Sequence, residues 1–172
     1  MKVVQLKEKE SKFKVEVKEK TSAWTHEFII YQWYDSRQEN YESKFKLIID
    51  LQQLSQKFVK VEKTRTSAIT SDKTVTYLTI DDFNNLDLIS IPFVMKRRSI
   101  KGNYHLDRFI YSTYSSEYLL EVEDDDINLL ELQEIQILED VSEDSKYLNI
   151  NMTIPFEAFH KEELIKLCNI LK

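Results

Sequence analysis

Carboxylate and ammonium side chains alternate along residues 8–14 of this sequence. Glu8, Glu10, Lys12 and Lys14 fall on one face if the segment is extended, because successive side chains of a strand point to opposite sides. Carboxylate oxygens are the ligands that hard divalent cations prefer, and lysine ammonium groups bind phosphate oxygens. The pattern therefore fits a divalent cation held beside a polyanion. It also fits the solvent-exposed face of an ordinary half-buried strand.

Charged pairs at alternate positions recur in later segments that are rich in β-branched and aromatic residues. An acidic pair lies at Glu121 and Glu123, and basic pairs lie at Lys44 and Lys46, Lys63 and Arg65, and Lys96 and Arg98. On an open sheet these pairs would face solvent. In a closed barrel, alternate residues of every strand face an enclosed lumen. Such a lumen would offer cations for phosphate oxygens and carboxylates for a divalent cation.

The periodicity of apolar residues predicts an α+β chain of about eight mostly antiparallel strands with two or three helices. Strands are expected at residues 8–17, 27–34, 44–48, 57–65, 74–80, 93–100, 104–110 and 117–123. Polar turns are expected at 71–73 and at 101–103. Helical spacing predicts packing helices at 127–139 and 156–171, and Asp81 or Asp82 would cap a short helix.

Composition excludes several classes of protein. The single cysteine, Cys168, allows no intrachain disulfide, and no window approaches the roughly 18 apolar residues of a membrane span. These features lead us to expect a cytoplasmic location. The single glycine, Gly102, excludes every glycine-rich phosphate loop, so side chains would have to bind any phosphate.

Charge is distributed unevenly along the chain. Residues 1–110 hold 20 Lys and Arg against 15 Asp and Glu, whereas residues 111–172 hold 4 against 15. The net charge of −6 argues against a general binder of nucleic-acid backbone. An acidic tail would explain the overall imbalance, but it does not explain why the basic residues alternate along strands.

Several motifs, in order along the chain, resemble the CYTH domain of the triphosphate tunnel metalloenzymes. Glu8-Lys9-Glu10-Ser11-Lys12 is similar to that family's Glu-x-Glu-x-Lys first strand, and Ile30-Tyr31-Gln32-Trp33-Tyr34 is similar to the second strand of its bacterial members. Three later segments resemble its basic strand, its aspartate strand and its Glu-x-Glu strand: Lys96-Arg97-Arg98, His105-Leu106-Asp107-Arg108-Phe109 and Leu120-Glu121-Val122-Glu123. Residues 140–149 resemble its closing segment.

The resemblance implies one domain over residues 1–172, folded as an eight-stranded antiparallel β-barrel that forms a tunnel with a few packing helices. It implies hydrolysis of inorganic tripolyphosphate, or of a thiamine or nucleoside triphosphate, supported by Mg²⁺ or Mn²⁺. Cyclisation of ATP to cyclic AMP is the alternative reaction. The expected partner is a small-molecule triphosphate, with no nucleic acid and no membrane, for a monomer or a homodimer.

The resemblance also assigns roles to individual residues. The implied metal ligands are Glu8, Glu10, Asp107, Glu121 and Glu123. The implied phosphate-binding residues are Lys12, Lys44, Lys46, Lys63, Arg65, Lys96 and Arg98, and Glu10 and Lys12 would act directly in catalysis. Two departures stand out: lysines occupy positions 44 and 46, where relatives often have bidentate arginines, and residues 74–78 carry no carboxylate. A non-catalytic polyphosphate- or nucleotide-binding module is therefore a further alternative.

Overall fold

The computed structural model describes residues 1–18, 24, 26–115, 117–123, 127–128 and 132–170. Eight long strands dominate it: β1 (Val3–Val17), β2 (His26–Gln38), β3 (Tyr41–Asp50), β4 (Ser55–Arg65), β5 (Thr70–Leu78), β6 (Pro92–Lys101), β7 (Tyr104–Tyr111) and β8 (Tyr118–Glu123). Two α-helices, α1 (Ile80–Asn84) and α2 (Ala158–Ile170), are present in the same residues. Neither is long and apolar enough to cross a membrane.

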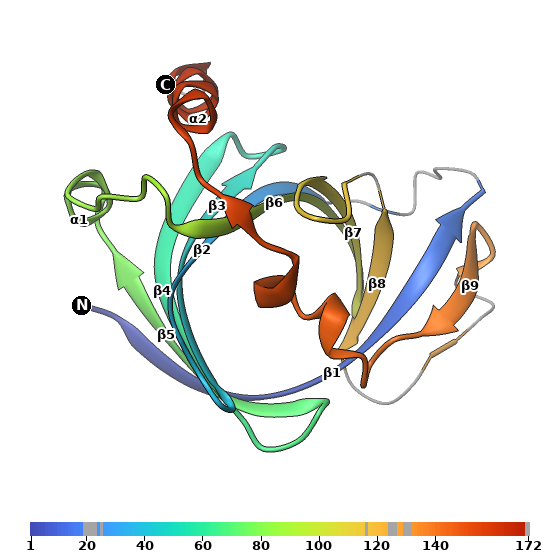
Figure 1. Cartoon of the computed structure of the whole chain (residues 1–172). Coiled ribbons are helices and arrows are strands. Elements are labelled where there is room, and N and C mark those ends of the chain that lie inside the picture. Colours follow the sequence, from blue (N-terminus) through green and yellow to red (C-terminus); the bar gives the residue numbers. More distant parts are fainter. Residues whose placement is uncertain (19–23, 25, 116, 124–126, 129–131, 171–172) are drawn as a thin grey trace.

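The eight strands close into an antiparallel β-barrel (Figure 1). Around the barrel the order is β6-β2-β3-β4-β5-β1-β8-β7, and pairing between β7 and β6 closes the ring. Two short strands attach to it: β9 (Ile135–Asp140) extends from β1, and β10 (Ile154–Pro155) pairs with β6. The predicted α+β class and eight-stranded barrel are confirmed.

Side chains of β2 alternate between the lumen and the outer wall. Tyr31 and Trp33 point outward, where they pack with Phe93 of β6 and with Phe156 and Leu164 beside and within α2. The intervening side chains of β2 point into the lumen. The charged residues that line the lumen lie on the opposite face of the sheet from this apolar cluster.

The segment between β9 and β10 crosses the inside of the barrel (Figure 1). It contains two short 3-10 helices, Ser145–Tyr147 and Asn149–Met152. Ile150 and Met152 pack against Val94 and other buried side chains of the lumen face. This inserted segment, residues 141–152, fills part of the lumen and forms one wall of the cavity described below.

Two of the sharp turns between strands use residues that tolerate a left-handed backbone. Asn40 (φ 60°) joins β2 to β3, and Gly102 (φ 55°) joins β6 to β7. The turn expected at 101–103 is thus confirmed. The Gly102 conformation is one that glycine adopts without the strain of a β-carbon.

Three local predictions need correction. The helix expected at 127–139 is wrong where the structure describes it, since residues 135–140 form β9; residues 129–131 lie outside the described residues. Ile135 and Ile137 alternate onto the core beside β1, a two-residue period hidden within helix-like spacing. The turn expected at 71–73 is wrong because β5 begins at Thr70.

The short helix is capped two or three residues earlier than expected. Thr79 is the N-cap, and Asp82 completes the capping box by accepting hydrogen bonds from the backbone N–H and the hydroxyl of Thr79. The second predicted helix is confirmed from residue 158 to residue 170, and residues 171–172 lie outside the described part of the chain.

Candidate functional site

A charged cavity occupies the barrel lumen. It has a volume of about 90 Å³, several times the roughly 10–15 Å³ that one water needs on the same measure. Eleven of the twelve predicted site residues line it: Glu8, Glu10, Lys12, Lys44, Lys46, Lys63, Arg65, Lys96, Arg98, Glu121 and Glu123. The lining carries eight Lys and Arg side chains against six Asp and Glu, although the whole chain has a net charge of −6. The lumen therefore concentrates positive charge in an acidic protein.

Glu8 on β1 is held by two lysines from neighbouring strands. Lys63 Nζ lies 2.6 Å from Oε1 and Lys73 Nζ lies 2.7 Å from Oε2. Burial alone would raise the pKa of Glu8, but the two ammonium groups outweigh it and lower that pKa to about 2. Both carboxylate oxygens are thus engaged by protein cations.

Glu42 on β3 forms a second buried cluster. Its Oε1 lies 2.9 Å from Lys44 Nζ, and its Oε2 lies 3.2 Å from Arg65 Nη2. Burial again acts to raise the carboxyl pKa, and the neighbouring cations lower it to about 2. The ammonium of Lys44 also lies over the ring of Tyr34.

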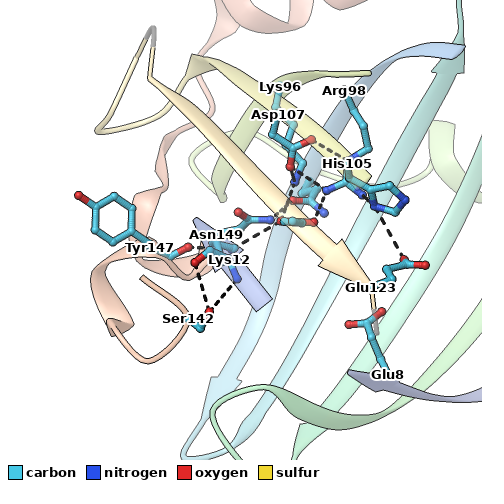
Figure 2. Close-up of polar contacts among 12 residues, drawn as sticks. Glu8, Lys12, Lys96, Arg98, His105, Asp107, Glu123, Ser142, Tyr147 and Asn149 are labelled. Atoms are coloured by element: carbon cyan, nitrogen blue, oxygen red, sulfur yellow. Dashed lines mark hydrogen bonds and ion pairs between the residues drawn. The ribbon is translucent and has the colours of Figure 1, made fainter. Parts of the chain in front are cut away.

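Asp107 lies behind the cavity wall rather than on it. It is fully buried and accepts hydrogen bonds from Lys96 Nζ (2.5 Å), Arg98 Nε (2.6 Å) and Arg98 Nη2 (2.7 Å) (Figure 2). Arg98 also donates to Glu121, whose other oxygen lies 3.6 Å from Lys96 Nζ. Asp107 therefore contacts two cations of the cavity lining and orients them. Its assignment as a metal ligand stays a prediction.

Burial and ion pairing act in opposite directions within this cluster. Burial and Arg98 lower the pKa of Lys96 despite Asp107 and Glu121. For Glu121, burial would raise the pKa, but Arg98, Lys96 and Lys12 bring it well below its usual value. The neighbouring cations therefore keep the Glu121 carboxylate ionised.

Lys12 connects β1 to the inserted segment. Its Nζ donates to the backbone carbonyl of Tyr147 (2.8 Å) and lies 3.5 Å from Glu121 Oε1 (Figure 2). Its backbone N–H donates to Ser142 Oγ, which donates in turn to the Lys12 carbonyl. Lys14, two residues on, is partly exposed and pairs with Glu117 outside the cavity lining.

Lys46 is the exception among the lumen cations. It makes no hydrogen bond or ion pair with any residue that the structure describes. Burial and the positive charges of Arg98, Lys73, Lys96 and Lys44 lower its pKa well below the usual value. A cation surrounded by other cations is unfavourable until an anion arrives.

Tyr34 supplies an uncommitted donor to the same cavity. Its ring is 5% exposed, and its hydroxyl has no hydrogen-bond partner in the described part of the chain. Burial raises its pKa well above the usual value, so the hydroxyl keeps its proton. Buried polar groups are almost always hydrogen-bonded, so this hydroxyl is available to a ligand in the cavity.

Two lumen carboxylates on neighbouring strands lie opposite each other. Glu10 of β1 is directly opposite Glu123 of β8. Burial together with Glu8 and Glu10 raises the pKa of Glu123. His105 Nδ1 lies 3.8 Å from Glu123, but burial and Arg98 lower the His105 pKa to about 4, so this ring is neutral at pH 7.

These carboxylates fit a divalent cation only in part. Over the described residues, no group of three or more His, Cys, Asp and Glu side chains is arranged to hold a metal ion. Magnesium, however, is commonly held by one or two carboxylates together with substrate phosphates. Glu10 and Glu123 match that requirement, whereas Glu8 and Glu121 are engaged by lysine and arginine.

Sequence reasoning missed three charged residues of the cavity lining: Glu42, Lys73 and Asp144, the last of which lies on the inserted segment. Glu42 precedes Lys44 and Lys46 at the same two-residue spacing, so the alternation that identified the lysines also indicates Glu42. Lys73 was assigned to a turn, but it lies directly opposite Lys63 on β4. Extending β5 by four residues would have placed its side chain in the lumen.

No model of a protein family matches the chain, and a search of curated proteins also returns no match. The resemblance to the CYTH domain therefore depends on the sequence motifs and on a closed barrel compatible with a tunnel fold.

Proposed function

We propose that this protein binds a short triphosphate in the barrel lumen and hydrolyses it with the help of a divalent cation. The observation that carries the proposal is the position of Lys46, which has no carboxylate partner among the described residues and shares the cavity lining with seven other Lys and Arg side chains. A polyphosphate supplies the missing negative charge at high density. The same reaction is implied by the resemblance to the CYTH family, whose tunnel fold is compatible with this barrel.

The lumen offers donors that are already oriented for phosphate oxygens. Asp107 holds Lys96 and Arg98, and the Tyr147 carbonyl holds Lys12. The Tyr34 hydroxyl provides a neutral donor. Because phosphoryl transfer spreads negative charge over the phosphate oxygens, cations fixed in advance stabilise the transition state without reorganisation.

Glu10 and Glu123 would hold the divalent cation. Their facing carboxylates repel each other until a cation lies between them, as the raised pKa of Glu123 indicates. Mg²⁺ or Mn²⁺ bound there would supply further positive charge for the phosphate oxygens. Glu8, with both oxygens engaged by lysines, would set the position of Lys63 and Lys73 rather than bind metal directly.

The decisive experiment measures phosphate release. The purified chain is incubated with tripolyphosphate and with common nucleoside triphosphates, with and without Mg²⁺ or Mn²⁺. We expect metal-dependent release that Lys46→Ala lowers at least about tenfold, the loss of one charge-assisted contact. Lys7→Ala, an exposed lysine on β1, is the matched control and should leave release unchanged. No release from any triphosphate by the parent would exclude the hydrolase.

A non-catalytic binding module is the second candidate, and two observations favour it. Over the described residues no three-ligand metal group is present, and β5 contributes Lys73 to the lumen but no carboxylate. Tripolyphosphate would then raise the melting temperature without turnover, since a ligand that binds only the folded state stabilises it. Cyclisation of ATP remains a prediction, and production of cyclic AMP with pyrophosphate would establish it.

A further inference from the structure

A second chamber of the lumen adjoins the charged cavity. It has a volume of about 220 Å³, and four apolar side chains line it: Phe28, Ile30, Ile48 and Ile100. Lys46 and Arg98 belong to the lining of both chambers, so the two spaces meet at these cations. Together they reach the lower end of the roughly 300–1,000 Å³ typical of small-molecule sites.

Strand register places the apolar chamber on the same lumen face as the charged cavity. On β2, Phe28 and Ile30 precede Gln32 and Tyr34 at two-residue spacing, and the latter two line the charged cavity. Phe28 is directly opposite Arg98. On β3 and β6 the lumen face thus changes from Lys46 and Arg98 to Ile48 and Ile100 within two residues. β4 contributes the polar side chains of Ser55 and Lys57 to the same chamber.

Phe28 gives the chamber an aromatic wall beside the aliphatic side chains of Ile30 and Ile48. Its ring stacks on that of His26, with centroids 6.5 Å apart and an interplanar angle of 14°. At the rim, Asp50 Oδ1 accepts backbone hydrogen bonds from Gln52 and Gln53, each at 2.9 Å, which fixes the carboxylate. Asp50 also lines the chamber, so it offers an oriented acceptor beside the apolar walls.

Inorganic triphosphate has no group that these apolar walls would contact. Pockets for organic ligands combine apolar and aromatic walls with a few fixed polar groups. The chamber has this composition, and the cations that would bind phosphate stand at its inner end. A ligand with a polyphosphate in the charged cavity and a flat organic group beyond Lys46 and Arg98 would occupy both spaces.

We propose that the chamber lined by Phe28, Ile30, Ile48 and Ile100 binds a heterocyclic group attached to the polyphosphate, so the substrate is an organic triphosphate. This inference rests on the proposed function, because the charged cavity must bind the phosphates. Asp50 would accept a hydrogen bond from a ring amino or N–H group. Aromatic and aliphatic contacts would supply the preference over the inorganic anion.

Calorimetric titration with two kinds of probe tests the proposal. Tripolyphosphate reports the charged cavity alone, and a panel of ATP, GTP, CTP, UTP and thiamine triphosphate reports both chambers, all at one Mg²⁺ concentration. In the parent protein we expect at least one panel member to bind about tenfold more tightly than tripolyphosphate. Ile48→Ala and Phe28→Ala should remove most of this preference while changing tripolyphosphate affinity less than about twofold.

Ile110→Ala, on the outer face of β7, is the matched control, and thermal unfolding verifies that each variant is folded. Should Phe28→Ala fail to fold, Ile48→Ala alone carries the test. If tripolyphosphate binds the parent as tightly as every panel member, the organic-group proposal is overturned and the proposed function stands. It is likewise overturned if the chamber variants weaken both kinds of probe equally. If neither kind of probe binds, the proposed function itself fails.

Discussion

Replacing Glu42 by glutamine should change stability and anion binding in opposite directions. Glu42 is 5% exposed and accepts from Lys44 and Arg65, at 2.9 Å and 3.2 Å. It is the shared partner of two lumen cations. The Glu42→Gln substitution therefore leaves the charges of Lys44 and Arg65 uncompensated in the free protein. The same substitution frees both cations to bind phosphate oxygens.

The magnitude of the stability change follows from the pKa. The pKa of Glu42 falls from 4.5 to about 2 on folding, and each unit of difference corresponds to about 1.4 kcal/mol. The ionised carboxylate thus contributes about 3 kcal/mol to the free energy of unfolding at neutral pH. Because the folded-state pKa is the lower one, this contribution is complete above pH 4.5 and is lost as the pH falls through 2. Breaking a buried ion pair by removing one partner costs about 3–5 kcal/mol, which agrees.

Urea unfolding at pH 7 and at pH 3 measures the first effect. We expect Glu42→Gln to lower the free energy of unfolding by about 3 kcal/mol at pH 7 and by less at pH 3. Calorimetric titration measures the second effect, and the variant should bind tripolyphosphate severalfold more tightly. Glu39→Gln, an exposed carboxylate beside the same hairpin turn, controls for the change in net charge. A variant as stable as the parent, or one that binds tripolyphosphate more weakly, would refute this reasoning.

Three further predictions concern single groups in the lumen. Glu10→Gln relieves the repulsion with Glu123, so the free energy of unfolding should hold or rise, while the Mn²⁺ affinity measured by calorimetric titration should fall at least about tenfold. Glu16→Gln, exposed on the same strand, is the control and should change neither stability nor Mn²⁺ affinity. Unchanged Mn²⁺ binding by Glu10→Gln would show that the metal lies elsewhere. Tripolyphosphate should raise the lowered pKa of Lys46, so binding should take up protons at any pH between that lowered pKa and 10.5. Proton uptake is measured as a dependence of the binding heat on the ionisation heat of the buffer. Equal binding heats in all buffers would contradict this prediction. Asp107→Asn should lower the free energy of unfolding by about 3–5 kcal/mol and weaken tripolyphosphate binding, and a variant with parent-like melting temperature and affinity would show that Asp107 orients neither of its cations.

Part of the site could be read from local sequence. The two-residue spacing of Glu8, Glu10 and Lys12 placed all three on one face, and the structure puts that face in the lumen. The same spacing indicates Glu42, which lies two residues before Lys44. Lys73 was not predicted, because a polar stretch beside a strand has the composition of a turn, and only its pairing with β4 extends β5 through it.

The helix expected at 127–139 shows why local patterns fail at some elements. Ile135 and Ile137 fit a helical repeat when read with the leucines before them. In the folded chain, β1 leaves an edge next to which residues 135–140 form hydrogen bonds as β9. Tertiary pairing overrides local propensity there, because an unpaired strand edge leaves a row of backbone groups without partners.

The sequence by itself determined which side chains share a face, because alternation along an extended chain is a local property of the backbone. Only the tertiary structure decided that this face is enclosed, since closure depends on β7 pairing with β6 around the whole ring. Register across strands then decided which charges meet. Glu8 received Lys63 and Lys73, Glu10 was set opposite Glu123, and Lys46 was left among cations. Those contacts join residues from strands far apart in the chain, so no local pattern contains them.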